Sequence, residues 1–350
     1  MTQFQTLRGT DILVTGHTGF TGTWACHLLY MLGARVHGYS LPPPTSPAMF
    51  DLTDARETLQ SHTIGDITDL NALSACFHQC RPKLVLHLAA QPLVLRSYRD
   101  PIGTFLTNMQ GTVNVLEAAR LSPEVRGVVC ITTDKVYANN GDNRPFIETD
   151  PLGGKDPYSA SKAAAEMAIA SYRELLATNG RDMAIEVARG GNIIGGGDWA
   201  DDRIIPDLAR AISNGTPLTV RNPDAVRPWQ HVLALLHGYV ILLDRVARGE
   251  SQSGEAWNFG PVDETPISVG QLLQTLMSQW TKVPLQIQQV HVGNAPFQRQ
   301  REEKYLSINS EKARTLLSWQ PHWSNVRATV ETASWYRMRS EEHTSELQSH

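Results

Sequence analysis

The sequence has few of the features that mark secreted, membrane-bound or metal-binding proteins. Its 350 residues include only four cysteines, Cys26, Cys76, Cys80 and Cys130. Their spacing matches no metal motif, so we predict no metal site and expect buried thiols in a reducing compartment. No apolar run approaches the roughly 18 residues that a spanning helix needs, and the first residues lack a charged and then apolar leader. We therefore predict no membrane contact, no signal peptide and a cytoplasmic location.

An excess of basic charge is also missing. The net charge is −4, and lysines and arginines are scattered rather than clustered, which gives no reason to expect a nucleic acid or an anionic membrane as partner. A hydrophobic content of 41% with 19% charged residues is typical of a globular protein. The length suits one large α/β domain with a smaller lobe.

The end of the chain differs in character from the rest. The last twelve residues, RSEEHTSELQSH, resemble the in-frame translation of a sequencing-adapter oligonucleotide. We expect residues 339–350 to be a non-native tail that does not pack against the fold, and we leave them out of the fold prediction.

A glycine-rich turn near the N-terminus is the most informative segment. Apolar residues 12–14 lead into Gly16, Gly19 and Gly22, and an amphipathic helix follows. Glycines allow a tight bend and close approach of the backbone to a pyrophosphate, and the helix N-terminus adds partial positive charge. An ordinary strand–turn–helix is the alternative, but the position between a strand and a helix favours a dinucleotide site.

The second predicted strand, residues 34–39, departs from the usual dinucleotide pattern. Many NAD-binding folds end this strand on an acid that bonds the ribose hydroxyls, whereas here the position is about Ser40. No arginine follows closely to bind a 2′-phosphate, so NAD is favoured over NADP. Prolines in residues 41–47 predict a rigid loop.

Strand and helix patterns then alternate through residue 190. This alternation predicts an α/β fold, a doubly wound Rossmann-type parallel sheet with a smaller C-terminal α/β substrate lobe. We assign residues 1–190 to the dinucleotide-binding domain, with 228–262 returning to it, and 191–338 mainly to the lobe. Ligands in such sheets lie beyond the carboxyl ends of the strands, where Gly16, Asp66, Ala89 and Thr133 should converge.

A second motif begins a long predicted helix. Asp156 is a good N-cap and Pro157 a good first residue, so Tyr158 and Lys162 should lie side by side on one face. We expect the ammonium and the helix N-terminus to lower the pKa of Tyr158, which would make it a base for a hydroxyl proton. A solvated helix surface is the alternative.

Several stretches together resemble the extended short-chain dehydrogenase/reductase family. They are TGHTGFTG at 15–22, LAAQ at 88–91, TTDKVY at 132–137, YSASK at 158–162, RGGN at 189–192, NIIGGGDW at 192–199 and RPWQHV at 227–232. The resemblance covers residues 10–338 and is strongest to the members that dehydrate CDP-glucose. It implies an NAD-dependent lyase that converts CDP-D-glucose to CDP-4-keto-6-deoxy-D-glucose, in deoxysugar biosynthesis for surface polysaccharide such as lipopolysaccharide O-antigen.

The resemblance also implies roles for individual residues. In the reaction, Tyr158 with Lys162 and Thr133 would handle the 4-hydroxyl, and Asp134 and Lys135 would be the acid and base of the elimination. A lysine is a base only when neutral and an aspartate an acid only when protonated, whereas pairing favours both charged forms, so which of them takes the C5 proton stays open. The residues implied in NAD binding are Gly16, His17, Thr18, Gly19, Phe20, Gly22, Asp66, Ile67, Leu88, Ala89, Ala90, Gln91, Asn108, Tyr158 and Lys162. Those implied in substrate binding are Gln91, Thr133, Asn192, Arg203, Arg227 and Arg299.

Two other functions remain open, and a homodimer or homotetramer is a family expectation. One alternative is a dehydratase for another nucleotide sugar, or an epimerase, although an epimerase has no need of a base such as Lys135 for C5. The other is a non-catalytic NAD-binding sensor, which would have no need to retain Thr133, Tyr158 and Lys162.

Overall fold

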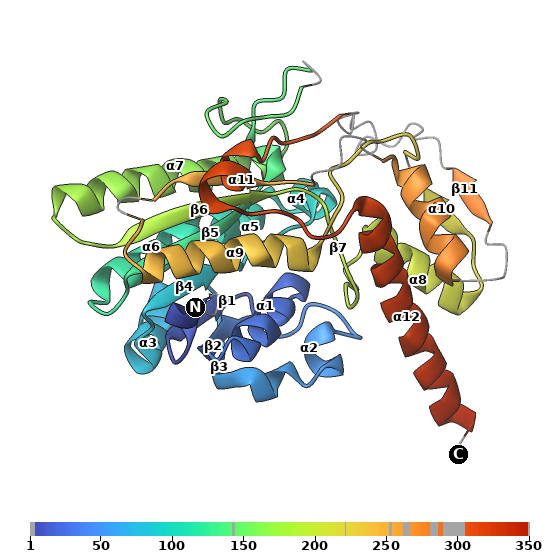
Figure 1. The fold of residues 1–350 in the computed structure, drawn as a ribbon, viewed down its shortest axis with the longest axis horizontal. Helices are drawn as coiled ribbons and strands as arrows, with labels where there is room; N and C mark the ends of the chain where they lie inside the picture. Colours follow the sequence, from blue (N-terminus) through green and yellow to red (C-terminus); the bar gives the residue numbers. More distant parts are fainter. Residues whose placement is uncertain are drawn as a thin grey trace.

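A parallel sheet of seven strands organises the protein (Figure 1), in the order β10-β6-β5-β4-β1-β2-β3. The computed structural model describes residues 4–141, 144–220, 222–251, 254–261, 267–280, 286–289 and 305–348, with the side chains of 289 and of 340–348 left out. Strands run on both sides of β1, which is the doubly wound arrangement, so the predicted α/β fold class is confirmed. The strands are β1 (Asp11–Thr15), β2 (Arg35–Ser40), β3 (Leu59–Ile64), β4 (Leu84–His87), β5 (Gly127–Thr133), β6 (Ala184–Gly190) and β10 (Ala256–Phe259).

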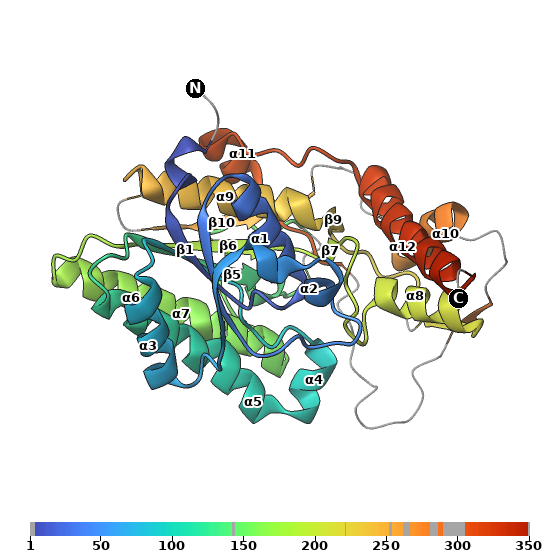
Figure 2. The same cartoon turned by 90° about the horizontal axis from the view of Figure 1, so that it is seen from below.

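Helices cover both faces of this sheet. The helices that precede residue 180 are α1 (Phe20–Met31), α2 (Met49–Leu52), α3 (Leu70–Cys80), α4 (Val94–Arg99), α5 (Pro101–Phe105), α6 (Gly111–Leu121) and α7 (Pro157–Thr178). Those that follow are α8 (Ile204–Asn214), α9 (Val232–Ala247), α10 (Val269–Trp280), α11 (Glu311–Leu317) and α12 (Asn325–Gln348). Figure 2 shows α3, α6 and α7 on one side of the sheet and α1 and α9 on the other.

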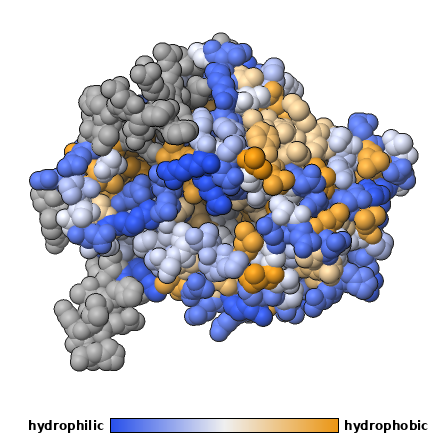
Figure 3. All heavy atoms as spheres, turned by 180° about the vertical axis from the view of Figure 1, so that it is seen from behind, coloured by the Kyte–Doolittle hydropathy of each residue, from blue (hydrophilic) through white to orange (hydrophobic). Residues whose placement is uncertain are grey.

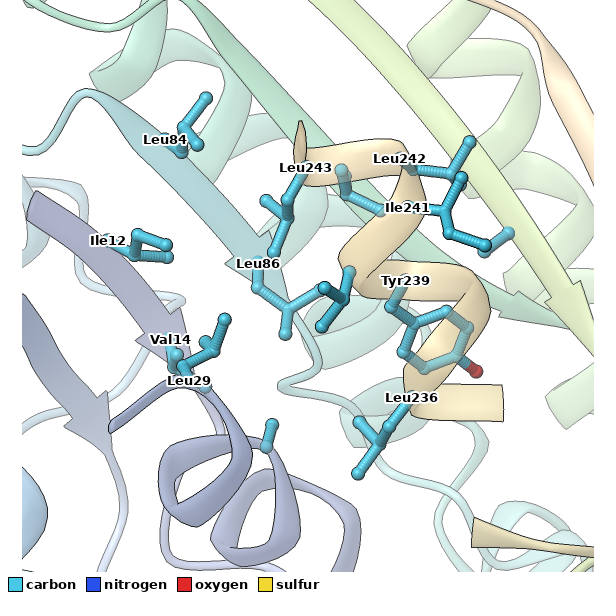
Figure 4. Packing of buried hydrophobic residues seen from close by; sticks show 14 of the residues in the cluster. Ile12, Val14, Leu29, Leu84, Leu86, Leu236, Tyr239, Ile241, Leu242 and Leu243 are labelled. Carbon is cyan, nitrogen blue, oxygen red and sulfur yellow. The ribbon is translucent and has the colours of Figure 1, made fainter. Parts of the chain in front are cut away.

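The core follows from this layering. The central strands β1, β4 and β5 are buried on both faces, so their residues are mostly apolar in succession rather than in alternation, as in β4 with the sequence LVLH. Figure 4 shows one of the two layers, in which Leu243 of α9 lies beside Leu86 of β4, in the same cluster as Ile12 of β1. Because the strands are parallel and in register, their carboxyl ends share one edge of the sheet.

The smaller lobe lies beyond that edge. Helices α8, α10 and α12 pack around their own apolar cluster, together with a short sheet of β8 (Leu218–Val220) and β11 (Ile287–Gln289). A second short sheet, β7 (Ile193–Ile194) with β9 (Gln230–His231), connects the lobe to the main sheet. Strand β10 pairs with β6 and α9 packs on the sheet, so segments from beyond residue 190 belong to it. The domain boundaries at 190 and 338 stay predictions.

Three local features differ from the sequence-based expectation or extend it. Helices α5 and α6 are joined by a π-helical turn, Leu106–Gln110, which no local sequence pattern predicted. The backbone of the supposed tail continues α12 as helix through Gln348, and its side chains beyond Arg339 lie outside the described residues, so its packing stays a prediction. In the part of the chain that the structure describes, no helix is long and apolar enough to cross a bilayer.

Candidate active site

The glycine turn lies between β1 and α1, at the carboxyl edge of the sheet. Gly16 has a positive φ of 77°, and a Cβ on it would lie 2.7 Å from the backbone nitrogen of Ala89. A Cβ on Gly22 would lie 2.1 Å from the carbonyl oxygen of Gly16, whereas one on Gly19 would meet that oxygen at an ordinary 3.4 Å. The turn is thus a cradle of bare backbone at the start of α1, whose N-cap Gly19 gives no side-chain capping bond. Such a cradle fits a pyrophosphate.

The side chains of His17 and Thr18, which follow Gly16, point away from this cradle and contact β2 and β3. The His17 ring lies against Gly38, and its Nε2 is 2.7 Å from Nδ1 of His62. Burial lowers the pKa of His17 to about 3, so the ring is neutral at physiological pH. Thr18 donates to the carbonyl oxygen of Leu41 and shares a 2.8 Å hydrogen bond with the Ser40 hydroxyl. The strand end that usually carries an acid is therefore a neutral pair of hydroxyls.

The other residues implied in NAD binding line the same edge. Asp66 follows β3, where its carboxylate accepts from the backbone of Thr68 at 2.9 Å, and Ile67 beside it is buried. Leu88, Ala89 and Ala90 continue β4 toward the glycine turn. The side chain of the buried Asn108 makes two hydrogen bonds with the backbone of Gln91. It accepts from the backbone nitrogen at 2.8 Å and donates to the carbonyl oxygen at 3.1 Å.

These bonds show a supporting role for two residues of that set. The Gln91 side chain is occupied by Thr104 at 3.0 Å and by both polar backbone atoms of Leu93. The Asn108 amide also donates to Ser161 of α7 at 2.9 Å. Their side chains therefore shape the loop after β4 and connect it to the helix that carries Tyr158 and Lys162.

Tyr158 and Lys162 lie on one face of α7 as predicted, but their electrostatics differ from the prediction. Asp156 caps the helix as expected, accepting from the backbone of Ser159 at 3.0 Å. Burial raises the pKa of Tyr158 to about 12, although a hydrogen bond with Thr133 opposes the rise. The ammonium of Lys162 turns to the carbonyl oxygen of Ile131, 3.0 Å away.

The expectation that Lys162 lowers the pKa of Tyr158 is therefore wrong for the protein without cofactor or substrate. Burial acts on both groups and outweighs their proximity along the helix, because each loses hydration of its charged form. It lowers the pKa of Lys162 to about 8, which brings this amine closer to neutrality than a surface lysine. A positive charge does act on Tyr158, but it comes from Arg203, which lowers the pKa of the tyrosine.

Asp134 and Lys135 follow β5 in a single 3₁₀ turn, Asp134–Val136, and form a contact ion pair. The Lys135 ammonium lies 3.0 Å from Oδ1 of Asp134, which also accepts from the Thr133 hydroxyl at 3.0 Å. The Asp134 side chain has 0% exposed surface, against 28% for Lys135. The second carboxylate oxygen, Oδ2, is buried and has no hydrogen-bond partner among the described residues. A donor group of a bound ligand could therefore hydrogen-bond to Oδ2 of Asp134.

Of the polar residues implied in substrate binding, the structure brings only some to the site. Arg203 is the N-cap residue of α8, pairs with Asp198 at 3.0 Å and acts electrostatically on Tyr158, so it belongs to the site. Asn192 is 3.4 Å from the Lys135 ammonium and belongs to it as well. Arg227 is buried and donates to the carbonyl oxygen of Val226, whereas Arg299 lies outside the described residues.

Sequence analysis missed the residues that hold Arg203 in place. One of them is Asp198, within the segment NIIGGGDW, whose carboxylate accepts a hydrogen bond from the Arg203 guanidinium. The Tyr336 hydroxyl donates to the backbone carbonyl oxygen of Asp198. The five-residue spacing of Asp198 and Arg203 was the available signal. Tyr336 comes from α12, at the far end of the chain, and no local pattern connects it with this loop. In the part of the chain that the structure describes, no group of His, Cys, Asp and Glu could hold a metal ion.

Comparisons with known proteins place this geometry among nucleotide-sugar enzymes. The family model described as GDP-mannose 4,6 dehydratase matches residues 13–331. A CDP-glucose 4,6-dehydratase of Salmonella typhimurium is 38% identical over 338 residues, which cover 94% of this chain and 91% of that protein.

Two solved structures share the fold. A dTDP-glucose 4,6-dehydratase of Bacillus anthracis in complex with NAD superposes with a TM-score of 0.77 at 23% identity, covering 95% of this chain and 98% of that one. A UDP-glucuronic acid 4-epimerase of Bacillus cereus, in complex with UDP-glucuronic acid and NAD, gives a TM-score of 0.79 at 21% identity, over 94% and 100% of the two chains.

Proposed function

This chain belongs to the GDP-mannose 4,6 dehydratase family, and from that premise we propose its function. We propose that it is a lyase that dehydrates CDP-D-glucose to CDP-4-keto-6-deoxy-D-glucose with bound NAD. The observation that carries this proposal is the convergence, at one sheet edge, of a bare glycine cradle, a buried Tyr158–Lys162 pair and the Asp134–Lys135 pair. The 38% identity to a CDP-glucose 4,6-dehydratase supports cytosine as the base of the substrate nucleotide, which no single residue of the site indicates.

The glycine cradle and the α1 N-terminus fit the pyrophosphate of NAD, and Tyr158 and Lys162 would face its nicotinamide end. Bound NAD would supply the hydride-transfer chemistry for both the oxidation at C4 and the reduction at C6. Tyr158 takes the proton of the 4-hydroxyl, and Thr133 holds the same oxygen. The charge of Arg203 stabilises the tyrosinate, since it already lowers the pKa of Tyr158.

The Asp134–Lys135 pair supplies the acid and the base of the elimination. A ketone at C4 makes the C5 proton acidic, so a base at C5 and an acid at O6 complete the loss of water. The two side chains share a contact of 3.0 Å, and transfer of one proton across it turns the ion pair into a neutral acid and a neutral amine. Those are the forms that each role requires. Asp134 then protonates O6 and Lys135 accepts the C5 proton.

The diphosphate of the substrate requires cations at the lobe side of the site. We assign Arg203 to it, with Arg227 and Asn192 as further contacts. Arg299 stays a prediction because it lies outside the described residues. The four free cysteines are compatible with a reducing compartment, and we place the reaction in the cytoplasm, in deoxysugar biosynthesis for surface polysaccharide such as O-antigen.

We further propose that two copies associate through α5, the π turn, α6 and α7. These helices pack together, and Figure 3, which looks onto their side of the molecule, shows apolar side chains among polar ones. Ile102 is 74% exposed and Met167 is 60% exposed, and Leu106 and Leu121 are also exposed. A pocket lined by Pro101, Ile102, Phe105, Leu106, Met109 and Gln110 can receive an apolar side chain of the partner.

The test is to incubate the protein with NAD and with CDP-, dTDP-, GDP- and UDP-sugars and to assay for a 4-keto product. We expect product from CDP-glucose. Tyr158→Phe should abolish oxidation, whereas Lys135→Ala should retain oxidation of C4 and stop dehydration. Lys83→Ala, at an exposed lysine where β4 begins, is the matched control and should keep full activity. Full activity in Tyr158→Phe or Lys135→Ala, or product only from another nucleotide sugar, would refute the assignment.

A further inference from the structure

The segment after β7, residues 195–198, connects the start of α1 with the substrate lobe. We call it the glycine bridge. The indole N–H of Trp24, in the second turn of α1, donates to the carbonyl oxygen of Gly196 at 3.0 Å. Phe20, the first residue of α1, faces Gly195 so closely that a Cβ there would lie 3.2 Å from the ring. Both cartoons place this segment beside α1 and α2 (Figures 1 and 2). The helix that carries the proposed pyrophosphate site therefore touches the bridge directly.

The bridge is held by packing and is not a loose loop. All of Gly195, Gly196 and Gly197 are buried. A Cβ on Gly196 would lie 2.1 Å from the ring of Trp335 in α12, and one on Gly197 would lie 2.6 Å from the sulfur of Met49 in α2. Gly197 also has a positive φ of 87°. Because neighbours from both parts of the protein pack against its backbone, a shift of α1 cannot occur without a shift of the bridge.

The far end of the bridge reaches the site. Asp198 closes the segment and binds Arg203 at 3.0 Å, and Arg203 in turn acts on Tyr158. The Tyr336 hydroxyl fixes the carbonyl oxygen of Asp198 from the side of α12. A continuous chain of contacts thus runs from Trp24, through Gly196 and Asp198, to the arginine that we assign to the substrate diphosphate.

We propose that Trp24 is a positioning residue that couples cofactor binding to nucleotide-sugar binding through the glycine bridge. The inference rests on the proposed function, because it takes the glycine cradle as the NAD site and Arg203 as the diphosphate contact. Cofactor bound at the N-terminus of α1 fixes the position of this helix, and through the Trp24 bond also that of Gly196 and of Asp198, which holds Arg203. The coupling is reciprocal, so CDP tightens NADH binding by the same factor by which NADH tightens CDP binding.

Calorimetry of NADH binding, with and without saturating CDP, measures this coupling, since neither ligand turns over. We define the coupling ratio as the NADH dissociation constant without CDP divided by the constant with CDP, so a ratio above one means that CDP tightens NADH binding. Trp24→Phe keeps the aromatic packing and removes only the N–H donor, so we expect the ratio to fall by about fivefold, the equilibrium effect of one ordinary hydrogen bond. Trp319→Phe is the matched control. It removes a buried indole bond of the same kind, to the carbonyl oxygen of Ala234 at 3.1 Å, that includes no residue of the bridge.

A double-mutant cycle with Arg203→Gln gives an independent readout. In the Arg203→Gln background, Trp24→Phe should have no further effect on the ratio, because the contact through which it acts is gone. An unchanged ratio in Trp24→Phe, or an equal fall in Trp319→Phe, would overturn the inference. So would a wild-type protein that binds both ligands with a ratio of one. A wild-type protein that binds neither NADH nor CDP would instead refute the proposed function.

Discussion

Lys162 should lower the stability of the folded protein at neutral pH, and Lys162→Met should relieve that cost while abolishing activity. The side chain is 6% exposed, and burial lowers its pKa from 10.5 to about 8. A change of this size corresponds to about 3 kcal/mol against the charged form. Methionine fills a similar volume without a charge. The variant loses the hydrogen bond to Ile131, which is worth about 1 kcal/mol, so we expect a net gain of about 2 kcal/mol at pH 7.

The pH dependence identifies this cause. The folded-state pKa of Lys162 lies below the unfolded-state value, so between pH 8 and 10.5 the unfolded chain binds more protons and the wild type gains stability as pH rises. The advantage of Lys162→Met is therefore largest below pH 8, shrinks between pH 8 and 10.5, and becomes a deficit of about 1 kcal/mol above that range, where only the lost hydrogen bond remains. Thermal unfolding without added nucleotide, at several pH values, measures it as a few degrees in Tm. The reasoning is refuted if the variant is less stable at pH 7, or if the difference does not change with pH. Lys83→Met, at an exposed position, should show no such pH-dependent difference.

Two further predictions concern the glycine cradle and the exposed helix face. Gly22→Ala should lower Tm and weaken NADH binding by about tenfold to a hundredfold, because overpacking costs about 1–3 kcal/mol. Gly19→Ala, whose Cβ meets only an ordinary contact, should leave Tm near the wild-type value, and equal Tm values for the two variants would contradict the packing argument. Met167→Glu should shift the protein to monomer in sedimentation velocity, because a charge cannot be buried unpaired at an apolar interface. Leu316→Glu, at a residue of α11 that is 64% exposed, should leave the oligomer intact, and an unchanged Met167→Glu oligomer would exclude α7 as the interface.

Local patterns were enough to predict the parts of the site that are continuous in sequence. The turn from Gly16 to Gly22 and the capped start of α7 depend on backbone geometry and on i, i+4 spacing, which a short segment determines by itself. The doubly wound sheet follows from the alternation of strands and helices in the same way.

Properties that depend on burial or on distant segments could not be predicted in this way. The spacing of Tyr158 and Lys162 suggested mutual stabilisation, whereas both pKa values are set mainly by loss of hydration, which depends on the whole tertiary structure. Likewise, the glycines at 195–197 could be recognised in the sequence only as part of the segment NIIGGGDW. Their actual neighbours include Trp335 and Met49, which are far from them in sequence.

The central claim is that oxidation at C4, loss of water and reduction at C6 take place within one turnover on one bound NAD. CDP-glucose carrying deuterium at C4 tests it most directly, with the position of the label in the product read by mass spectrometry and NMR. We expect the deuterium at C6 of the 4-keto-6-deoxy product, together with one solvent-derived hydrogen at C5. Release of the label to solvent, or accumulation of NADH in step with an oxidised sugar that keeps its 6-hydroxyl, would contradict the claim.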